Sequence, residues 1–116
     1  MARVAALVDD MIFQMKLAET ARQLGVELNF AATPEALLAN LASSPGLVIV
    51  DLNAKGHPLE AVARLRAAGK CVRVVAFLSH VQTGLAERAR AAGCDEVLPR
   101  SSFTQNLAAI LSSAKV

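Results

Sequence analysis

The stretch "LVIVDLNAKGHPLEAV", residues 47–62, passes from one periodicity to another. It starts with four consecutive apolar residues, a run typical of a strand buried on both faces of a sheet, and the run stops at Asp51. In residues 58–69, apolar side chains recur at helical spacing and the segment ends on a glycine. A buried strand followed by an amphipathic helix predicts a β–α unit that carries a carboxylate where its strand ends.

The same alternation of strand and helix extends along the whole chain. Thr33 and Pro34 form a strong helix-start signal, and Gly25 is expected to end the preceding helix. Five units predict a single α/β domain, residues 1–116, with a flavodoxin-like parallel sheet in the order 2-1-3-4-5 and helices on both faces. The predicted strands are 3–8, 26–31 (at an edge), 46–50, 71–78 and 95–99, and the predicted helices are 10–25, 33–44, 58–69, 81–93 and 101–115.

The composition indicates a globular domain with one aliphatic core. Of 116 residues, 54% are hydrophobic, and four Phe are the only aromatic residues. The apolar runs are far shorter than the ~20 residues of a membrane helix, and two Asp interrupt the N-terminus too early for a secretory signal. We therefore expect a cytoplasmic location and no membrane partner.

Charge and cysteine content exclude further classes of protein. The formal net charge is only +2, and the basic residues between positions 64 and 73 have no aromatic residues among them, so they predict a solvated helix face and no nucleic-acid partner. Cys71 and Cys94 lack CxxC spacing, and two His are too few to complete a zinc site convincingly. Both cysteines are expected to be buried thiols, without a disulfide.

Polar side chains follow four of the predicted strands. Asp9 and Asp10 come after the first strand, Asp51 after the third, Ser79 after the fourth and Arg100 after the fifth. Because the carboxyl ends of parallel strands share one edge, we expect these groups to converge on one crevice. Three carboxylates would repel one another unless a cation such as Mg²⁺ lay between them, although Asp10 is also a candidate helix cap. One carboxylate could then attack a phosphoryl group, with the metal, hydroxyl and guanidinium neutralising its oxygens.

Four segments together resemble the receiver domain of two-component response regulators, of the chemotaxis-regulator type. They are "ALVDD", "VIVDLN", "VVAFLS" and "GCDEVLPR", and the resemblance covers essentially the whole chain. It implies a phospho-acceptor, Asp51, and an acidic pair that holds Mg²⁺, Asp9 and Asp10. It further implies that Asn53 supplies a backbone carbonyl to the metal, that Ser79 is the switch hydroxyl and that Arg100 stands in place of the family's Lys.

The chain departs from the receiver pattern at four places. Arg100 replaces the usual Lys and is followed by Ser101 in place of Pro. The loop "NAKGHPLE" after the acceptor lacks the usual Pro and Asp-Gly turn and is one residue shorter. His80 stands where a small residue is usual, and Val97 replaces the switch aromatic. Because Arg is planar and bulkier than Lys, the first exchange is not conservative.

Three functions are open on these residues. The first is a stand-alone receiver that takes a phosphoryl group on Asp51 from a histidine kinase or phosphotransfer protein. It would dock on a downstream protein through its fourth helix, fifth strand and fifth helix, and Arg100 would pair with Asp51 before modification. The second is a pseudo-receiver, a protein-interaction module that works without phosphate. The third is an enzyme or nucleotide-binding protein, which the absence of GxGxxG and GxxxxGK[ST] argues against, so we expect no enzymatic activity.

Overall fold

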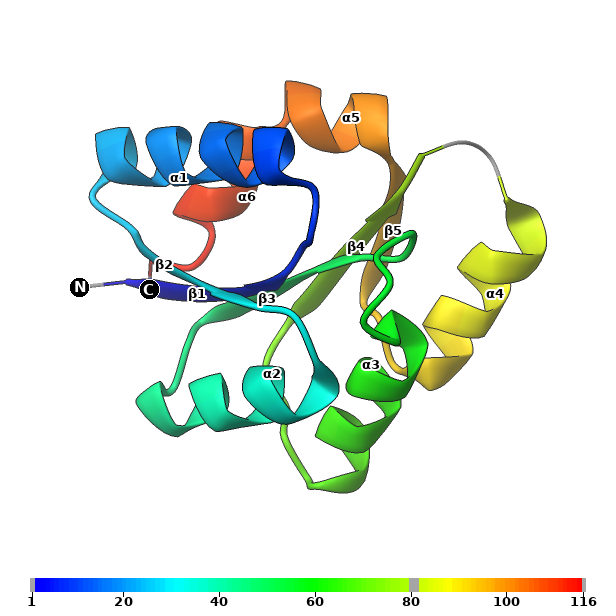
Figure 1. The fold of residues 1–116 in the computed structure, drawn as a ribbon. Coiled ribbons are helices and arrows are strands. Elements are labelled where there is room, and N and C mark those ends of the chain that lie inside the picture. Colours follow the sequence, from blue (N-terminus) through cyan, green and yellow to red (C-terminus); the bar gives the residue numbers. More distant parts are fainter. Residues whose placement is uncertain (1, 80–81, 116) are drawn as a thin grey trace.

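A computed structural model describes residues 2–79 and 82–115 as a five-stranded parallel sheet between two layers of helices (Figure 1). The strand order is β2-β1-β3-β4-β5, which confirms the predicted fold class and the edge position of β2. No helix in this part of the chain is both long and apolar enough to cross a membrane. The strands are β1 (Arg3–Leu7), β2 (Glu27–Ala31), β3 (Leu47–Asp51), β4 (Val74–Leu78) and β5 (Glu96–Pro99). The helices are α1 (Met11–Leu24), α2 (Pro34–Asn40), the 3₁₀ turn η1 (Leu41–Ser43), α3 (Pro58–Ala67), α4 (Thr83–Ala92), α5 (Arg100–Gln105) and α6 (Leu107–Ser112).

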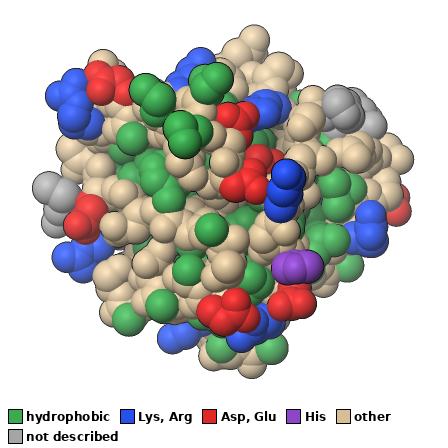
Figure 2. Space-filling model, in the orientation of Figure 1, with side chains coloured by type: hydrophobic (Ala, Val, Ile, Leu, Met, Phe, Trp, Pro, Cys, Tyr) green, Lys and Arg blue, Asp and Glu red, His purple; other side chains and the backbone are tan. Residues whose placement is uncertain are grey.

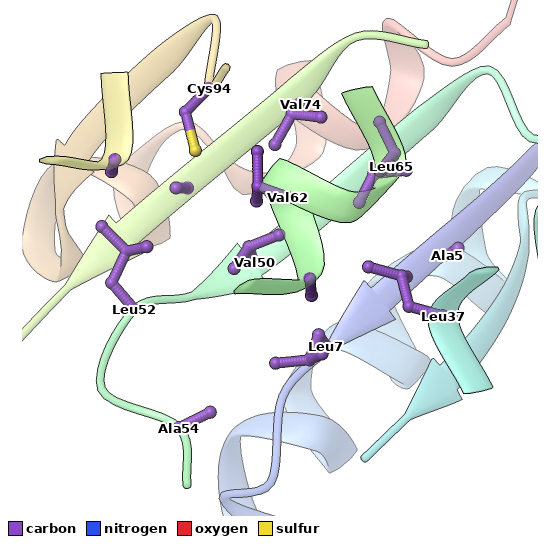
Figure 3. Packing of buried hydrophobic residues seen from close by; sticks show 14 of the residues in the cluster. Ala5, Leu7, Leu37, Val50, Leu52, Ala54, Val62, Leu65, Val74 and Cys94 are labelled. Carbon is purple, nitrogen blue, oxygen red and sulfur yellow. The ribbon is translucent and has the colours of Figure 1, made fainter. Parts of the chain in front are cut away.

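The three central strands are apolar throughout because helices cover both of their faces. On one face, alternate residues of β1, β3 and β4 pack with α2 and α3, as Val50, Val62 and Leu65 do in Figure 3. On the other face, the intervening residues pack against α1, α5 and α6, where Phe13, Phe77 and Phe103 form one aromatic cluster. In Figure 1 these two helical layers lie above and below the sheet. This burial on both faces explains the unbroken apolar runs in the sequence.

Local sequence signals placed the end of the first helix and the start of the second correctly. Gly25 adopts φ 70°, a left-handed conformation that ends α1 at low cost, and its N–H bonds to the last turn. The Thr33 side chain accepts a hydrogen bond from the Ala36 N–H, and Pro34 opens α2. Both predicted helix boundaries are confirmed.

Several predicted elements are shorter in the structure. The second helix, predicted over 33–44, ends at Asn40 and is followed by the 3₁₀ turn η1. The fourth strand begins at Val74, not at residue 71, and its first partner residue in β3 is Val48. The C-terminal helix is broken at Asn106, whose Nδ2 donates to the Ser102 carbonyl and whose backbone leaves the helical region. An Asn side chain that competes for backbone groups is a common reason for such a break. The start predicted for the fourth helix, at residue 81, lies outside the described residues.

Two further expectations require correction. Cys94 is buried as predicted, but Cys71 is exposed, because it lies in the turn before β4 and not in a strand. Arg66 is not simply a solvated residue of α3. Its guanidinium donates to the carbonyls of Gly93, Lys70 and Val72 and to the carboxylate of Asp95. These contacts join α3 to the turns that lead into β4 and β5.

Candidate functional site

Asp51 is the last residue of β3 and is the one charged residue that is buried among those described, with 5% of its surface exposed. Its Oδ1 accepts a hydrogen bond of 2.9 Å from the Asn53 N–H, as the chain turns away from the strand. Burial raises the pKa of Asp51, whereas the Asn53 N–H and the charge of Arg100 oppose this increase. The charges of Asp9 and Asp10 also raise the pKa of Asp51. The group formed by Asp9, Asp10, Asp51 and Arg100 is called the carboxylate pocket, or the Asp51 pocket, below.

Asp10 caps α1, the alternative that the sequence left open. Its Oδ1 accepts hydrogen bonds from the N–H groups of Ile12, at 3.0 Å, and Phe13, at 3.2 Å. Its Oδ2 accepts a hydrogen bond of 3.0 Å from Arg100 Nη2. The Phe13 N–H and the Arg100 guanidinium lower the pKa of Asp10. Both carboxylate oxygens therefore already have partners within the protein.

The expected pairing of Arg100 with Asp51 is wrong, since the ion pair that the structure shows is with Asp10. The Arg100 guanidinium lies over the Phe13 ring, 4.3 Å from its centroid, and 5.7 Å from the centroid of Phe77. Phe13 belongs to the first turn of α1, so a cation over this ring lies beside the carboxylate that caps the same turn. Arg100 acts on Asp51 only through its charge.

The remaining predicted residues also lie at this edge of the sheet. Asp9 is exposed and its Oδ2 accepts a hydrogen bond of 2.8 Å from the Lys55 N–H, which ties the end of β1 to the loop after β3. The Asn53 side chain accepts hydrogen bonds from the N–H and hydroxyl of Ser79. Figure 2 shows acidic side chains with basic ones beside them near the N-terminal end of α1. His80 lies outside the described residues.

The pocket does not form a ready-made metal site in this arrangement. In residues 2–79 and 82–115, no three or more His, Cys, Asp or Glu side chains are grouped so that they could hold a metal ion. Asp10 has both oxygens occupied by protein donors, and Asp9 has one. Mg²⁺ takes carboxylate oxygens as ligands, so in this arrangement it would compete with the protein donors on Asp10 and Asp9. Mg²⁺ binding by Asp9, Asp10 and Asp51, with the carbonyl of Asn53, stays a prediction.

Two surface features lie near the pocket. Between α4 and β5, a pocket of about 220 Å³ is lined by Val97, Leu98 and Ala86, among others, where the sequence has Val97 in place of an aromatic residue. On the first turns of α1, Met11, Ile12 and Met15 are 74%, 81% and 68% exposed. Sequence reasoning missed this second feature. The signal for the patch was the presence of three large apolar residues outside the buried stripe that Phe13, Leu17 and Ala21 form on α1.

Comparison with known proteins relies on structure, because the sequence matches no known family and no curated protein. A DNA-binding response regulator of the LuxR family from Staphylococcus aureus aligns over 98% of both chains, with a TM-score of 0.82 and 15% identity. A two-component response regulator from Clostridium difficile aligns over 100% of both chains, with a TM-score of 0.80 and 15% identity. A chemotaxis response regulator of Vibrio cholerae covers 96% of this chain and 99% of its own, with a TM-score of 0.77 and 20% identity.

The chain has the fold of response regulator receiver domains. Within this receiver fold, the two acids after β1, the acid that ends β3, and the polar residues after β4 and β5 all lie at the carboxyl edge of the sheet. That is the edge where open α/β sheets place their ligand sites. The comparisons thus establish the receiver fold of the chain.

Proposed function

We propose that this chain is a receiver-fold signalling domain in which Asp51 accepts a phosphoryl group. The supporting observation is the burial of Asp51, whose side chain accepts one hydrogen bond from the described residues and whose pKa is raised. Burying a carboxylate with so few partners costs stability, and such residues are concentrated at functional sites. Its position at the switch-point edge of the sheet makes it the natural nucleophile of the pocket.

In the proposed reaction, one Asp51 oxygen attacks the phosphorus atom of the donor. A P–O bond to Asp51 forms while the bond from phosphorus to the donor's nitrogen or oxygen breaks, and the donor keeps that electron pair. Among the described residues, Arg100 is the cation whose charge lowers the pKa of Asp51. Its guanidinium would offset the negative charge of the phosphoryl oxygens. The Ser79 hydroxyl, now bonded to Asn53, would have to rotate to reach them.

Delivery of the phosphoryl group requires a partner that covers the pocket. Met11, Ile12 and Met15 lie on the first turns of α1, whose start Asp10 caps, so they form an exposed apolar surface close to Asp10. We propose that a histidine kinase or phosphotransfer protein of the cytoplasm docks there. The pocket between α4 and β5 is the proposed contact for a downstream protein.

Acetyl phosphate and beryllofluoride, each with and without Mg²⁺, test the proposal. With acetyl phosphate, we expect wild type to gain the mass of one phosphoryl group. With either reagent, we expect the amide resonances around the pocket to shift. The Asp51→Asn variant should show neither change, whereas Glu60→Gln, a substitution on an exposed side chain, should behave as wild type. Unchanged mass and spectra in wild type under all conditions would exclude phosphoryl acceptance.

A second function, a phosphorylation-independent interaction module, is favoured by the contact between Arg100 and Asp10. This contact already gives the Asp10 carboxylate a positive partner without metal or phosphate. On this alternative, the downstream partner binds wild type and the Asp51→Asn variant equally well. A loss of binding in that variant would rule it out.

A further inference from the structure

We infer that Arg100 is a built-in counter-cation that competes with divalent metal for the carboxylate pocket and lowers its metal affinity. The inference concerns the pocket of the proposed function but does not depend on phosphoryl transfer. It follows from three features of the described residues: the saturation of Asp10, the fixation of Arg100 on aromatic rings, and the shared electrostatic field at Asp51.

Asp10 offers little to a metal while Arg100 stays in place. Oδ1 accepts hydrogen bonds from two N–H groups of the first turn of α1, and Oδ2 accepts one from the guanidinium at 3.0 Å. A cation that bound Oδ2 would share that oxygen with Arg100 and lie close to its positive charge. A cation that took Oδ1 would leave the helix terminus without its cap.

Arg100 is fixed by more than its ion pair. Its guanidinium is 4.3 Å from the centroid of Phe13 and 5.7 Å from that of Phe77. These rings are themselves held in contact, since their centroids are 5.1 Å apart and Phe103 stacks on Phe77 at 4.5 Å. The planar guanidinium can lie over these rings and interact with their π-electrons, whereas a Lys ammonium at the same position would be a mobile point charge.

The charge of Arg100 reaches beyond Asp10. Its guanidinium, held 3.0 Å from Asp10, also attracts the Asp51 carboxylate through its charge. A divalent cation entering between these acids would meet a fixed positive charge only a few ångströms away, which weakens its binding. Removal of the guanidinium should therefore expose Asp10 and release the pocket for metal.

Titration with MgCl₂ alone, followed by amide spectra and by calorimetry, tests the inference. Arg100→Met removes the charge but keeps an unbranched apolar side chain over the rings. We expect it to bind Mg²⁺ at least about tenfold more tightly than wild type, because a nearby like charge has been removed. Arg73→Met is the matched control: it removes an exposed arginine that pairs with Glu96, away from the pocket, and should leave Mg²⁺ affinity unchanged.

Phe13→Leu is the second variant, and it decides the matter if Arg100→Met does not fold. It keeps the guanidinium but removes the ring beneath it, so we expect a smaller gain in Mg²⁺ affinity. Equal or weaker binding in the folded variants would overturn the inference. The readout needs no phosphoryl donor. If Arg100→Met binds Mg²⁺ more tightly but wild type is not phosphorylated, this inference holds and the proposed function fails. If wild type is phosphorylated but Arg100→Met binds Mg²⁺ no more tightly, the proposed function holds and this inference fails.

Discussion

The amide oxygen of Asn53 accepts two hydrogen bonds from Ser79, one of 2.7 Å from its N–H and one of 2.9 Å from its hydroxyl. The Asn53 Nδ2 also donates to Gln82 Oε1 at 3.0 Å. One side chain thus joins the turn after β3 to the end of β4 and to the residue before α4. A change in the Asp51 pocket can pass through Asn53 to the α4–β5 face.

Asn53→Ala should destabilise the protein by about 1–2 kcal/mol, since it removes three partly exposed hydrogen bonds. Ser79→Ala is the matched comparison. It removes only the hydroxyl bond and should cost less, about 0.5–1 kcal/mol. Urea unfolding measures both, and hydrogen exchange of the Ser79 amide should accelerate only when Asn53 is changed. Equal losses of stability in the two variants would contradict this division of roles.

The carboxylate of Asp51 makes stability depend on pH. Its pKa is raised above the ordinary value of 3.8 in the folded protein, so the folded state holds this proton more firmly than the unfolded chain does. The contribution of Asp51 to stability therefore falls as the pH rises from about 3.8 through the raised pKa. Asp51→Asn removes this titration, so the variant should exceed wild type in stability at neutral pH, with the difference shrinking in acid. Urea unfolding at several pH values would show a constant difference if Asp51 were not responsible.

The two cysteines should differ sharply in reactivity. Burial raises the pKa of Cys94 to about 11, so only about a thousandth of this thiol is ionised at pH 8. Cys71 is exposed. A thiol reagent at pH 8 should therefore label one residue of the native protein quickly, and Cys71→Ser should abolish that fast phase. If the fast phase persists in this variant, Cys94 is accessible after all.

Arg66 should contribute more to stability than its neighbour Arg64. Arg66→Ala leaves the carbonyls of Gly93 and Val72 without their charged donor and should cost about 2–3 kcal/mol. Arg64→Ala breaks only exposed ion pairs with Glu35 and Glu60 and should cost less than about 1 kcal/mol. Thermal or urea unfolding of the two variants checks this order, and the reverse order would show that the Arg66 contacts do not persist in solution.

The exposed apolar patch on α1 should matter only for a protein donor. Met15→Glu should slow phosphorylation by the histidine kinase or phosphotransfer protein that acts fastest on wild type, because a charge enters the apolar contact. Its rate with acetyl phosphate, which needs no docking surface, should be unchanged. Gln23→Glu, on an exposed residue near the other end of α1, is the control with the same charge change. Equal slowing with both donors would point to damage in the pocket itself.

The sequence by itself determined the layered β–α architecture and the edge at which the polar residues gather. Apolar runs without polar interruption require strands covered on both faces, and the helix signals at Thr33–Pro34 and Gly25 act over only a few residues. Such local and periodic patterns can be recognised in the sequence without knowledge of the tertiary structure. The convergence of Asp9, Asp10 and Asp51 followed from strand direction alone.

Only the tertiary structure decided which groups within the pocket bind one another. Whether Arg100 reaches Asp51 or Asp10 depends on where the rings of Phe13 and Phe77 meet, 64 residues apart in sequence, and no spacing rule encodes that contact. The exposure of Cys71 likewise depends on where β4 begins, which is at Val74. Side-chain pairing rests on sub-ångström packing between distant elements, whereas strand order rests on the pattern of apolar residues.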